Sequence, residues 1–429
     1  MRNPLAAAAG VFLFLATGAR AEGDADAPPV RTVIHAGVLI AEPGKPTLVN
    51  QSIIIEGGTI VAVTDGFVGG DDAIDLSDRT VLPGLIDMHT HVTGFEELDP
   101  AHPTGWIMQR ALARQSRSAL DAVPVLGAIL QRGFTTIRNL GDPAGVTYDL
   151  RDAIAAGKIV GPRMVVSEPQ ITVGGGDLRA SQFGVRAAVE PFLANRGECN
   201  GAEDCSRIVR EEIARGADVI KFRLSDLAFV DPKIETFETP AEVTAIIGTA
   251  HRLGRKVAVH TAFVDRETLL AVAAGADTIE HAPVDREILA AMKRSGTVFV
   301  PTLSASAFFA PILARLGIQR DFYGEALDSV RQAHQDGIML AYGTDLLPLT
   351  ADRQAYEFEE FVNAGLSPEE ALMTATVNAA VALGLSNTIG KIAPGMTADV
   401  IAVEGDPLKD VGVLQNVSFV MTNGTIIKQ

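Results

Sequence analysis

The stretch VLPGLIDMHTHV, residues 81–92, is an apolar run that ends in polar side chains. A short apolar run of this kind is typical of a buried strand. Successive side chains of a strand point to opposite faces, so His89 and His91 share one face. The stretch therefore predicts a buried strand that carries two imidazoles side by side at its carboxyl end.

Seven more short apolar runs follow this one, and each precedes a segment compatible with a helix. They are residues 135–140, 163–167, 218–222, 256–261, 278–281, 298–302 and 339–344. Eight strand-then-helix units over roughly 250–300 residues are typical of a (β/α)8 TIM barrel. We therefore expect an α/β fold with a (β/α)8 barrel over residues 83–385. Near its end, Ser367 and Glu370 predict the start of a helix and Gly384 predicts its end.

Both ends of the chain carry β-branched runs separated by turn residues. Those near the start are residues 32–36, 38–40, 51–55 and 59–63, and those near the end are residues 398–403, 417–421 and 425–427. Gly57-Gly58 and Asn423-Gly424 have the composition of hairpin turns. We expect residues 30–82 and 386–429 to combine into one small β-sandwich domain built from both termini.

The overall composition is that of a globular protein with an aliphatic core. Hydrophobic residues make up 47% of the chain, charged residues 21% and aromatic residues 5%. These proportions exclude a disordered or fibrous protein. The formal net charge of −17 has the wrong sign for binding nucleic-acid phosphates or an anionic membrane. The expected partner is therefore a small-molecule substrate, with no nucleic acid.

The first 21 residues are typical of a secretory signal peptide. Arg2 precedes an Ala/Leu/Phe-rich run over residues 5–16, and Ala19-Arg20-Ala21 has the pattern of a cleavage site. The alternative is an unprocessed, partly buried N-terminal helix. Export predicts a periplasmic or secreted protein that has no membrane attachment after cleavage. In that oxidising compartment, Cys199 and Cys205 either close a small disulfide loop or remain free thiols.

Further polar side chains lie at the carboxyl ends of other predicted strands, where barrel enzymes place their active sites. They are Lys221, His260, His281 and Asp345. Imidazoles and a carboxylate are good ligands for zinc-like metals. A lysine ammonium cannot bind a cation, but a carbamylated lysine carries a carboxylate able to bridge two metals roughly 3.5–4 Å apart. The set predicts a metal site at the mouth of the barrel.

Each of these residues also has an ordinary structural explanation when it is taken alone. A lone histidine is usually hydrogen-bonded, a buried Lys221 would be ion-paired or snorkelling, and Asp345 would cap the next helix. The ordinary explanation is the one expected for the histidines that join no cluster, which are His35, His102, His251 and His334. Because the clustered residues all lie at strand ends, the metal interpretation is favoured for them.

The run over residues 82–91 resembles the opening motif of the amidohydrolase superfamily. The resemblance extends through Gly-Thr-Asp at 343–345, ATVNAA at 375–380 and GKIAPGMTAD at 390–399. Within the superfamily, the chain is similar to the imidazolonepropionase-related branch that includes Xaa-Pro dipeptidases and ochratoxin-degrading amidohydrolases. The run LLPLT, residues 346–350, departs from the small residue, glycine and Pro-His pair that often follow Gly-Thr-Asp in relatives.

The resemblance implies a binuclear centre of two divalent metal ions, with zinc as the expected metal. The implied ligands are His89, His91 and Asp345 for one ion and His260 and His281 for the other, with carbamylated Lys221 as the bridge. Asp345 would also accept a proton from the attacking water and return it to the leaving amine. Relatives of this type commonly form symmetric oligomers, so a homo-oligomer is expected.

The reaction implied is hydrolysis of the amide bond of an N-acyl amino acid or a dipeptide, ochratoxin-type amides included. Arg223 lies two residues beyond Lys221, and on the same strand face it would bind a substrate carboxylate; Arg179 is a second candidate. A salt bridge or a solvated loop charge is the alternative for these arginines. Two other functions stay open: hydrolysis of a cyclic amide of imidazolonepropionase or hydantoinase type, and a metal-stabilised binding protein without turnover.

Overall fold

The structure is a computed structural model of the 429-residue chain. It describes residues 31–70, 72–94, 113–142, 145–176, 186, 188, 196–224, 237–261, 265–315 and 320–429. Residues 31–429 form one compact unit. The predicted signal peptide lies outside the described residues. Within the described part, no helix has both the length and the apolar character that a membrane crossing requires.

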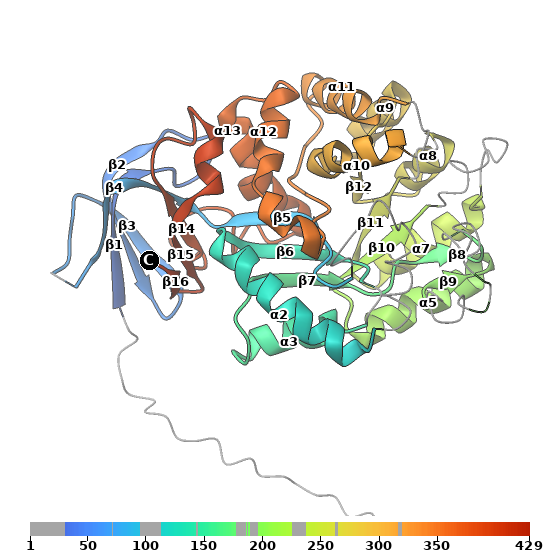
Figure 1. The fold of residues 1–429 in the computed structure, drawn as a ribbon, viewed down its shortest axis with the longest axis horizontal. Coiled ribbons are helices and arrows are strands. Elements are labelled where there is room, and N and C mark those ends of the chain that lie inside the picture. Colours follow the sequence, from blue (N-terminus) through green and yellow to red (C-terminus); the bar gives the residue numbers. More distant parts are fainter. Residues whose placement is uncertain are drawn as a thin grey trace, which may run out of the picture. The chain divides into compact units, whose positions relative to one another are not determined.

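Strands from both ends of the chain form one seven-stranded sheet, drawn in blue and red in Figure 1. They are β1 (Arg31–Leu39), β2 (Leu48–Glu56), β3 (Thr59–Asp65), β4 (Ile74–Pro83), β14 (Val400–Val403), β15 (Val417–Thr422) and β16 (Thr425–Lys428). The order is β16-β15-β14-β4-β1-β2-β3, so the pairing of β4 with β14 joins the two ends of the chain. Only β1 and β4 run parallel; the other neighbouring pairs are antiparallel.

One face of this sheet closes around its own core. Ile53 of β2 and Ile60 of β3 share a hydrophobic cluster with Phe419 and Met421 of β15, although β3 and β15 lie toward opposite edges of the sheet. A backbone hydrogen bond of 2.8 Å from Ile60 N to Met396 O helps to bring these edges together. The strands therefore form one curved sheet with an enclosed interior, where the sequence analysis expected a sandwich.

The stretch over residues 81–92 is divided between two sheets, which corrects the prediction of a single strand. β4 ends at Pro83, and β5 (Leu85–Thr90) begins after Gly84. Gly84 N donates to Asp399 O in the terminal sheet, and a Cβ at Gly84 would lie 2.2 Å from Thr135 Oγ1. The chain passes from one sheet to the next at a position that has no room for a side chain.

The centre of the chain contains two parallel sheets. β5, β6 (Phe134–Leu140) and β7 (Arg163–Ser167) form the first; β10 (Val219–Arg223), β11 (Lys256–His260), β12 (Thr278–Glu280) and β13 (Val298–Val300) form the second. A separate two-residue pair joins β8 (Thr172–Val173) to β9 (Glu198–Cys199). These strands match the first seven predicted barrel strands closely, apart from the division at Gly84.

The eighth predicted strand, residues 339–344, is not formed as a strand. Leu340 makes an isolated bridge with Phe299 of β13, and the amide of Tyr342 donates to Thr374 O over 3.0 Å instead of to a neighbouring strand. Even so, the segment connects the two parallel sheets, because Met88 N of β5 donates to Tyr342 O over 2.9 Å. After β7, at the other edge of the first sheet, Ile171 makes an isolated bridge with Phe222 of β10 in the second sheet.

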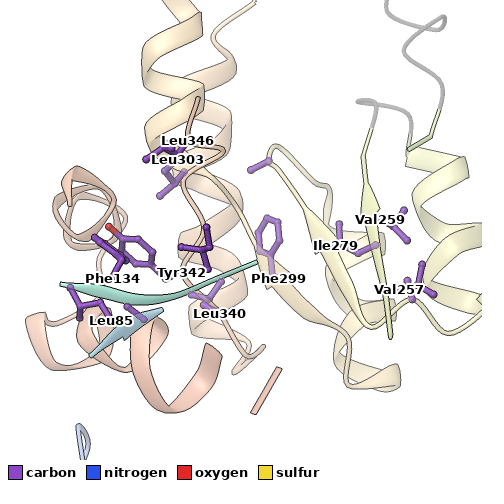
Figure 2. Packing of buried hydrophobic residues seen from close by; sticks show 14 of the residues in the cluster. Leu85, Phe134, Val257, Val259, Ile279, Phe299, Leu303, Leu340, Tyr342 and Leu346 are labelled. Atoms are coloured by element: carbon purple, nitrogen blue, oxygen red, sulfur yellow. The ribbon is translucent and has the colours of Figure 1, made fainter. Parts of the chain in front are cut away.

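Apolar side chains from both parallel sheets belong to one core cluster. Figure 2 shows Leu85 and Phe134 from the first sheet, Val257 and Ile279 from the second, and Tyr342 from the connecting segment. The ring centroids of Phe134 and Tyr342 lie 5.6 Å apart. The two sheets thus share a single interior, and the residues at their carboxyl ends are brought into reach of one another.

Helices follow most of the parallel strands. They are α2 (Gln115–Gln131), α3 (Thr147–Ala155), α5 (Gly201–Arg215), α7 (Pro240–Arg252), α8 (Asp265–Ala273), α9 (Arg286–Ser295), α10 (Leu303–Arg315), α11 (Phe322–Gln335), α12 (Tyr356–Asn363), α13 (Pro368–Met373) and α14 (Ala379–Leu383). Short helical turns lie at η3 (Pro348–Arg353) and η5 (Val411–Gln415), and η4 (Thr374–Asn378) is a π-helical turn between α13 and α14. The predicted start at Ser367 is confirmed by a reciprocal cap with Glu370, and α14 ends at Gly384, where φ is +75°.

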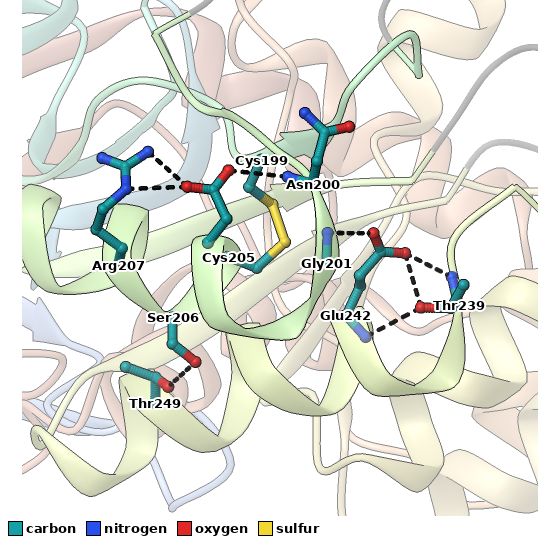
Figure 3. Close-up of a disulfide and its surroundings, with 10 residues drawn as sticks. Cys199, Asn200, Gly201, Cys205, Ser206, Arg207, Thr239, Glu242 and Thr249 are labelled. Atoms are coloured by element: carbon teal, nitrogen blue, oxygen red, sulfur yellow. Dashed lines mark hydrogen bonds and ion pairs between the residues drawn. A yellow bond between two sulfur atoms is a disulfide. The ribbon is translucent and has the colours of Figure 1, made fainter.

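The two cysteines form a disulfide, which resolves the alternatives left open by the sequence. Cys199 belongs to β9 and Cys205 to the start of α5, as Figure 3 shows. In the same region Glu242 accepts hydrogen bonds from Gly201 N and Thr239 N. The first turns of α5 and α7 are therefore joined by a carboxylate beside the disulfide.

Candidate metal centre

The structure brings together the six residues that the sequence predicted as metal ligands. His89 lies near the end of β5 and His91 directly follows that strand. Lys221 lies in β10, His260 ends β11, His281 follows β12, and Asp345 follows the segment 339–344. The Nε2 atoms of His91 and His89 lie 3.2 Å and 3.5 Å from Asp345 Oδ1. Lys221 Nζ lies 3.4 Å from His89 Nε2. The His281 ring lies 4.7 Å from that of His89 and 4.4 Å from that of His260, centroid to centroid.

Three of these side chains have the donor arrangement of a metal site. One ligand atom from each of His89, His91 and Asp345 lies within 4.8 Å of the other two. His89 Nδ1 lies 2.9 Å from Glu280 Oε2, and His91 Nδ1 lies 3.3 Å from Asp142 Oδ1. A partner on Nδ1 fixes the ring so that Nε2 faces inward, as in metal-bound histidines. The donor set and its support therefore fit a divalent cation.

Glu280 is a functional residue that the sequence analysis missed. Its carboxylate also accepts a hydrogen bond of 2.7 Å from Arg138 Nη2 on β6, and both side chains are buried. Arg138 further donates to Met88 O over 2.6 Å, beside His89. One sequence pattern could have identified this pair. Arg138 is a charged residue inside the apolar strand FTTIRNL, and Glu280 is one inside the strand TIE.

Asp87 joins the end of β5 to the segment that carries Asp345. Its carboxylate accepts hydrogen bonds from Thr344 Oγ1 over 2.7 Å and from Gln354 Nε2 over 2.9 Å. It also accepts from the amides of His89 and Thr344, each over 3.1 Å. Asp345 adopts a left-handed φ of +53°, which is uncommon for a residue other than glycine. The Asp87 contacts hold this backbone in place.

Burial sets the direction of the pKa shift for four basic side chains of the cluster. It lowers the pKa of His89 to about 4 and the pKa values of His260 and His281 well below their usual range, so these rings are neutral near pH 7. Burial also lowers the pKa of Lys221 to about 8, although Glu280 and Asp345 oppose that shift. Neutral imidazoles are the form that binds metals, and a lysine with a lowered pKa is a better nucleophile near neutral pH.

The pKa of His91 moves in the opposite direction. Burial lowers it, but hydrogen bonds to Asp142 and Asp345 outweigh burial and raise it to about 9. Burial likewise raises the pKa of Asp345, and the nearby histidines outweigh it and hold that pKa well below its usual range. His91 therefore keeps a proton between two carboxylates, and metal binding would displace that proton.

The two predicted substrate arginines have different outcomes. Arg223 ends β10, is partly buried and pairs in register with His260 of β11. Its Nη1 lies 3.5 Å from Gln170 Oε1. Arg179 lies outside the described residues. Arg223 is therefore close to the cluster, at the end of the strand that carries Lys221.

A small cleft opens beside Asp345, and no sequence pattern pointed to it. It lies between α10 and the chain that follows Asp345. Its lining includes Phe308, Phe309, Leu346 and Leu347.

The histidines expected to have ordinary roles have other partners. His35 Nε2 lies 2.8 Å from Val68 O, His251 Nε2 lies 2.8 Å from Asp277 Oδ2, and His334 Nε2 lies 3.6 Å from Glu370 Oε1. His102 lies outside the described residues.

The likeness to known proteins covers nearly all of the described chain. Residues 80–427 match the amidohydrolase family. This chain belongs to the amidohydrolase family. An ochratoxinase from Aspergillus niger is 30% identical over 436 residues, covering 92% of this amidohydrolase and 86% of that protein. The crystal structure of the A. niger enzyme has a TM-score of 0.78 at 25% identity, covering 94% of this chain and 96% of that one.

Two further relatives agree with this assignment. An imidazolonepropionase from Cereibacter sphaeroides is 27% identical, covering 85% of this amidohydrolase and 90% of that protein. The crystal structure of a Xaa-Pro dipeptidase with bound methionine has a TM-score of 0.77 at 30% identity, covering 93% and 100% of the two chains. The resemblance drawn from the motifs is confirmed. This amidohydrolase is a hydrolase of C–N bonds.

Proposed function

We propose that this chain is a binuclear metal-dependent amidohydrolase that cleaves the amide bond of N-acyl amino acids or dipeptides. The observation that carries the proposal is the convergence of His89, His91, Lys221, His260, His281 and Asp345 from the ends of four strands and the loop after residue 344. The bridges at Leu340 and Ile171 support a closed (β/α)8 barrel as its frame.

The proposed ligands of the first ion are His89, His91 and Asp345, and those of the second are His260 and His281, with carbamylated Lys221 between the ions. Lys221 is 1% exposed and lies beside His89, which supports a role inside the cluster rather than on the surface. Zinc is the proposed metal. When bound, such ions polarise the substrate carbonyl and acidify a water molecule.

Asp345 is the proposed general base and acid. Its side chain is 21% exposed, whereas that of His89 is 1% exposed, so its carboxylate lies where the cluster meets the cleft. Its lowered pKa keeps the carboxylate ionised near pH 7. A carboxylate that accepts a proton from water can return it to the leaving amine.

Arg223 is the proposed partner of a substrate carboxylate. Its position at the end of β10, in register with His260, supports contact with a group that extends from the cluster. A guanidinium binds a carboxylate through two parallel hydrogen bonds. The relative named Xaa-Pro dipeptidase, with its bound methionine, supports a product that is an amino acid. Hydrolysis of a cyclic amide is the second candidate, favoured by the likeness to imidazolonepropionase.

A periplasmic or secreted location is also proposed. The signal-peptide pattern over residues 1–21 supports it, and so does the Cys199–Cys205 disulfide, because disulfides persist in oxidising compartments.

The test is metal analysis of the purified protein together with a panel of N-acyl amino acids, dipeptides and cyclic amides. About two zinc-like ions per chain, with amino-acid release that is lost on chelation, are expected. Turnover of cyclic amides alone would favour the second candidate. Absence of bound metal, or activity that withstands prolonged chelation, would contradict the ligand assignment.

A further inference from the structure

The backbone at the candidate metal centre is unusual at two residues besides Asp345. Among the described residues, five that are not glycine adopt a left-handed φ: Asn50, His281, Thr302, Asp345 and Asn423. Asparagine tolerates this conformation, but it is costly for a β-branched residue such as threonine. The other three, His281, Thr302 and Asp345, all lie at the candidate metal centre. Strained backbone of this kind persists only where its surroundings enforce it, and it gathers at functional sites.

Thr302 lies between the end of β13 and the start of α10, and its hydroxyl contacts a proposed metal ligand. Its Oγ1 lies 2.8 Å from His281 Nδ1, and Thr302 is 1% exposed. A backbone hydrogen bond of 2.8 Å from His281 N to Val300 O joins the same two strand ends. The hydroxyl of Thr302 is therefore buried against one ring nitrogen of His281.

The start of α10 is held from α12, and this fixes Thr302 in turn. Glu357 of α12 is fully buried and accepts hydrogen bonds from Leu303 N over 2.9 Å and from Ser304 N over 2.6 Å. Thr302 O accepts a hydrogen bond from Ala305 N over 3.1 Å. Thr302 thus lies between an anchored strand and an anchored helix, so its hydroxyl has a fixed position.

The contact with Thr302 decides which nitrogen of His281 is free. A neutral imidazole carries one N–H, and its other nitrogen has the lone pair that can bind a metal. When Nδ1–H donates to Thr302 Oγ1, Nε2 keeps that lone pair. His89 and His91 have carboxylates beside Nδ1, whereas His281 has a neutral hydroxyl in that place. Thr302 can therefore fix the ring without adding a charge to the cluster.

We propose that Thr302 is a positioning residue, whose hydroxyl holds His281 with Nδ1 protonated and Nε2 open to the second metal ion. The inference rests on the proposed binuclear centre, and it adds a residue that acts through one of the ligands. The backbone supports it, because the fold keeps two costly conformations, at His281 and at Thr302, where this one hydrogen bond is made.

The first test is stepwise zinc titration of metal-free protein. Thr302→Val keeps the size and the β-branch of the side chain and removes only the hydroxyl. It should lower the affinity for one zinc ion by about 10–100-fold, the usual effect of losing a partner of a metal-bound histidine. The other ion should keep its affinity, because His89 and His91 keep their own partners. Thr302→Ser restores the hydroxyl and should restore the parent affinities.

The second test needs no metal. In chelated protein labelled with 15N-histidine, NMR shows which ring nitrogen of His281 carries the proton, and the signal is assigned by its loss in His281→Gln. We expect Nδ1 to be protonated in the parent and in Thr302→Ser. Thr302→Val should lose this preference.

Thr297→Val is the matched control. Thr297 directly precedes the same strand, is 3% exposed and donates to Ala276 O over 2.9 Å, so the variant also loses a buried hydroxyl. Both measurements should match the parent in this variant.

Parent affinities for both ions in Thr302→Val, or an equal loss for both, would overturn the inference and leave the binuclear centre intact. A His281 protonated at Nε2 in the chelated parent would also overturn it. That measurement needs no variant, so it decides if Thr302→Val fails to fold. A parent protein that binds no zinc would overturn the proposed function and the inference with it.

Discussion

Replacing Glu280 with glutamine tests whether one buried carboxylate both stabilises the fold and orients a metal ligand. Glu280 lies 2.7 Å from Arg138 Nη2 and 2.9 Å from His89 Nδ1, and its side chain is fully buried. Glu280→Gln keeps the shape of the side chain but leaves the guanidinium without its counter-charge. Breaking a buried ion pair from one side costs about 3–5 kcal/mol.

The lower end of that range is expected here. Arg138 keeps its hydrogen bonds to Met88 O and Thr278 Oγ1, and the glutamine oxygen still accepts one bond. We therefore expect the free energy of unfolding to fall by about 3 kcal/mol, measured by urea denaturation of chelated protein. His89 loses a charged partner at Nδ1, so zinc affinity measured separately should fall about 10–100-fold.

The matched control is Glu404→Gln. Glu404 pairs with Arg79 at 3.1 Å, but its side chain is 72% exposed, and an exposed pair contributes at most about 1 kcal/mol. Zinc affinity should not change in this variant. A loss below about 1 kcal/mol for Glu280→Gln, together with unchanged zinc affinity, would refute the reasoning, because the buried network would then do no more than the exposed one.

Three further predictions address the chemistry, the substrate and the disulfide. Asp345→Asn should keep most of the metal while kcat falls by about 10²–10⁴-fold, which is the usual contribution of a general acid–base group. Metal content and turnover measured on one sample check this, and retained turnover would contradict it. Arg223→Met should raise KM for N-acyl amino acids more than for the matching neutral amides, and an equal rise for both would exclude carboxylate binding. Replacing Cys199 and Cys205 together with serine should lower the free energy of unfolding by about 2 kcal/mol, since the closed loop is short; an unchanged urea midpoint would contradict it.

Most of the strand positions in the centre were predictable because their sequences carry local patterns. Residues 163–167 form β7 as predicted, since an apolar run bounded by turn residues identifies a buried strand without knowledge of its neighbours. The missing strand over residues 339–344 was not predictable in this way. Tyr342 donates its amide to Thr374, more than thirty residues along the chain, and no local pattern records that contact.

The candidate ligands were predictable for a different reason. Each one is a polar residue at the end of an apolar run, and parallel strands bring such ends together. Their supports were harder to identify, because Glu280 and Arg138 acquire a role only through one another across two sheets. Asp87 was part of a quoted motif, yet its bonds to Thr344 and Gln354 depend on a segment more than 250 residues away.

The segment that fails to form a strand carries much of the proposed chemistry, and the two facts are connected. A regular strand would hold residue 345 in an extended conformation, whereas Asp345 has a φ of +53°. That turn directs its carboxylate toward His91 at 3.2 Å and sends Leu346 and Leu347 along the cleft. Asp87 stabilises the irregular backbone from β5 by binding Thr344. One short irregular segment therefore sets the position of the proposed base against the two histidines, so substitutions that straighten it should lower turnover.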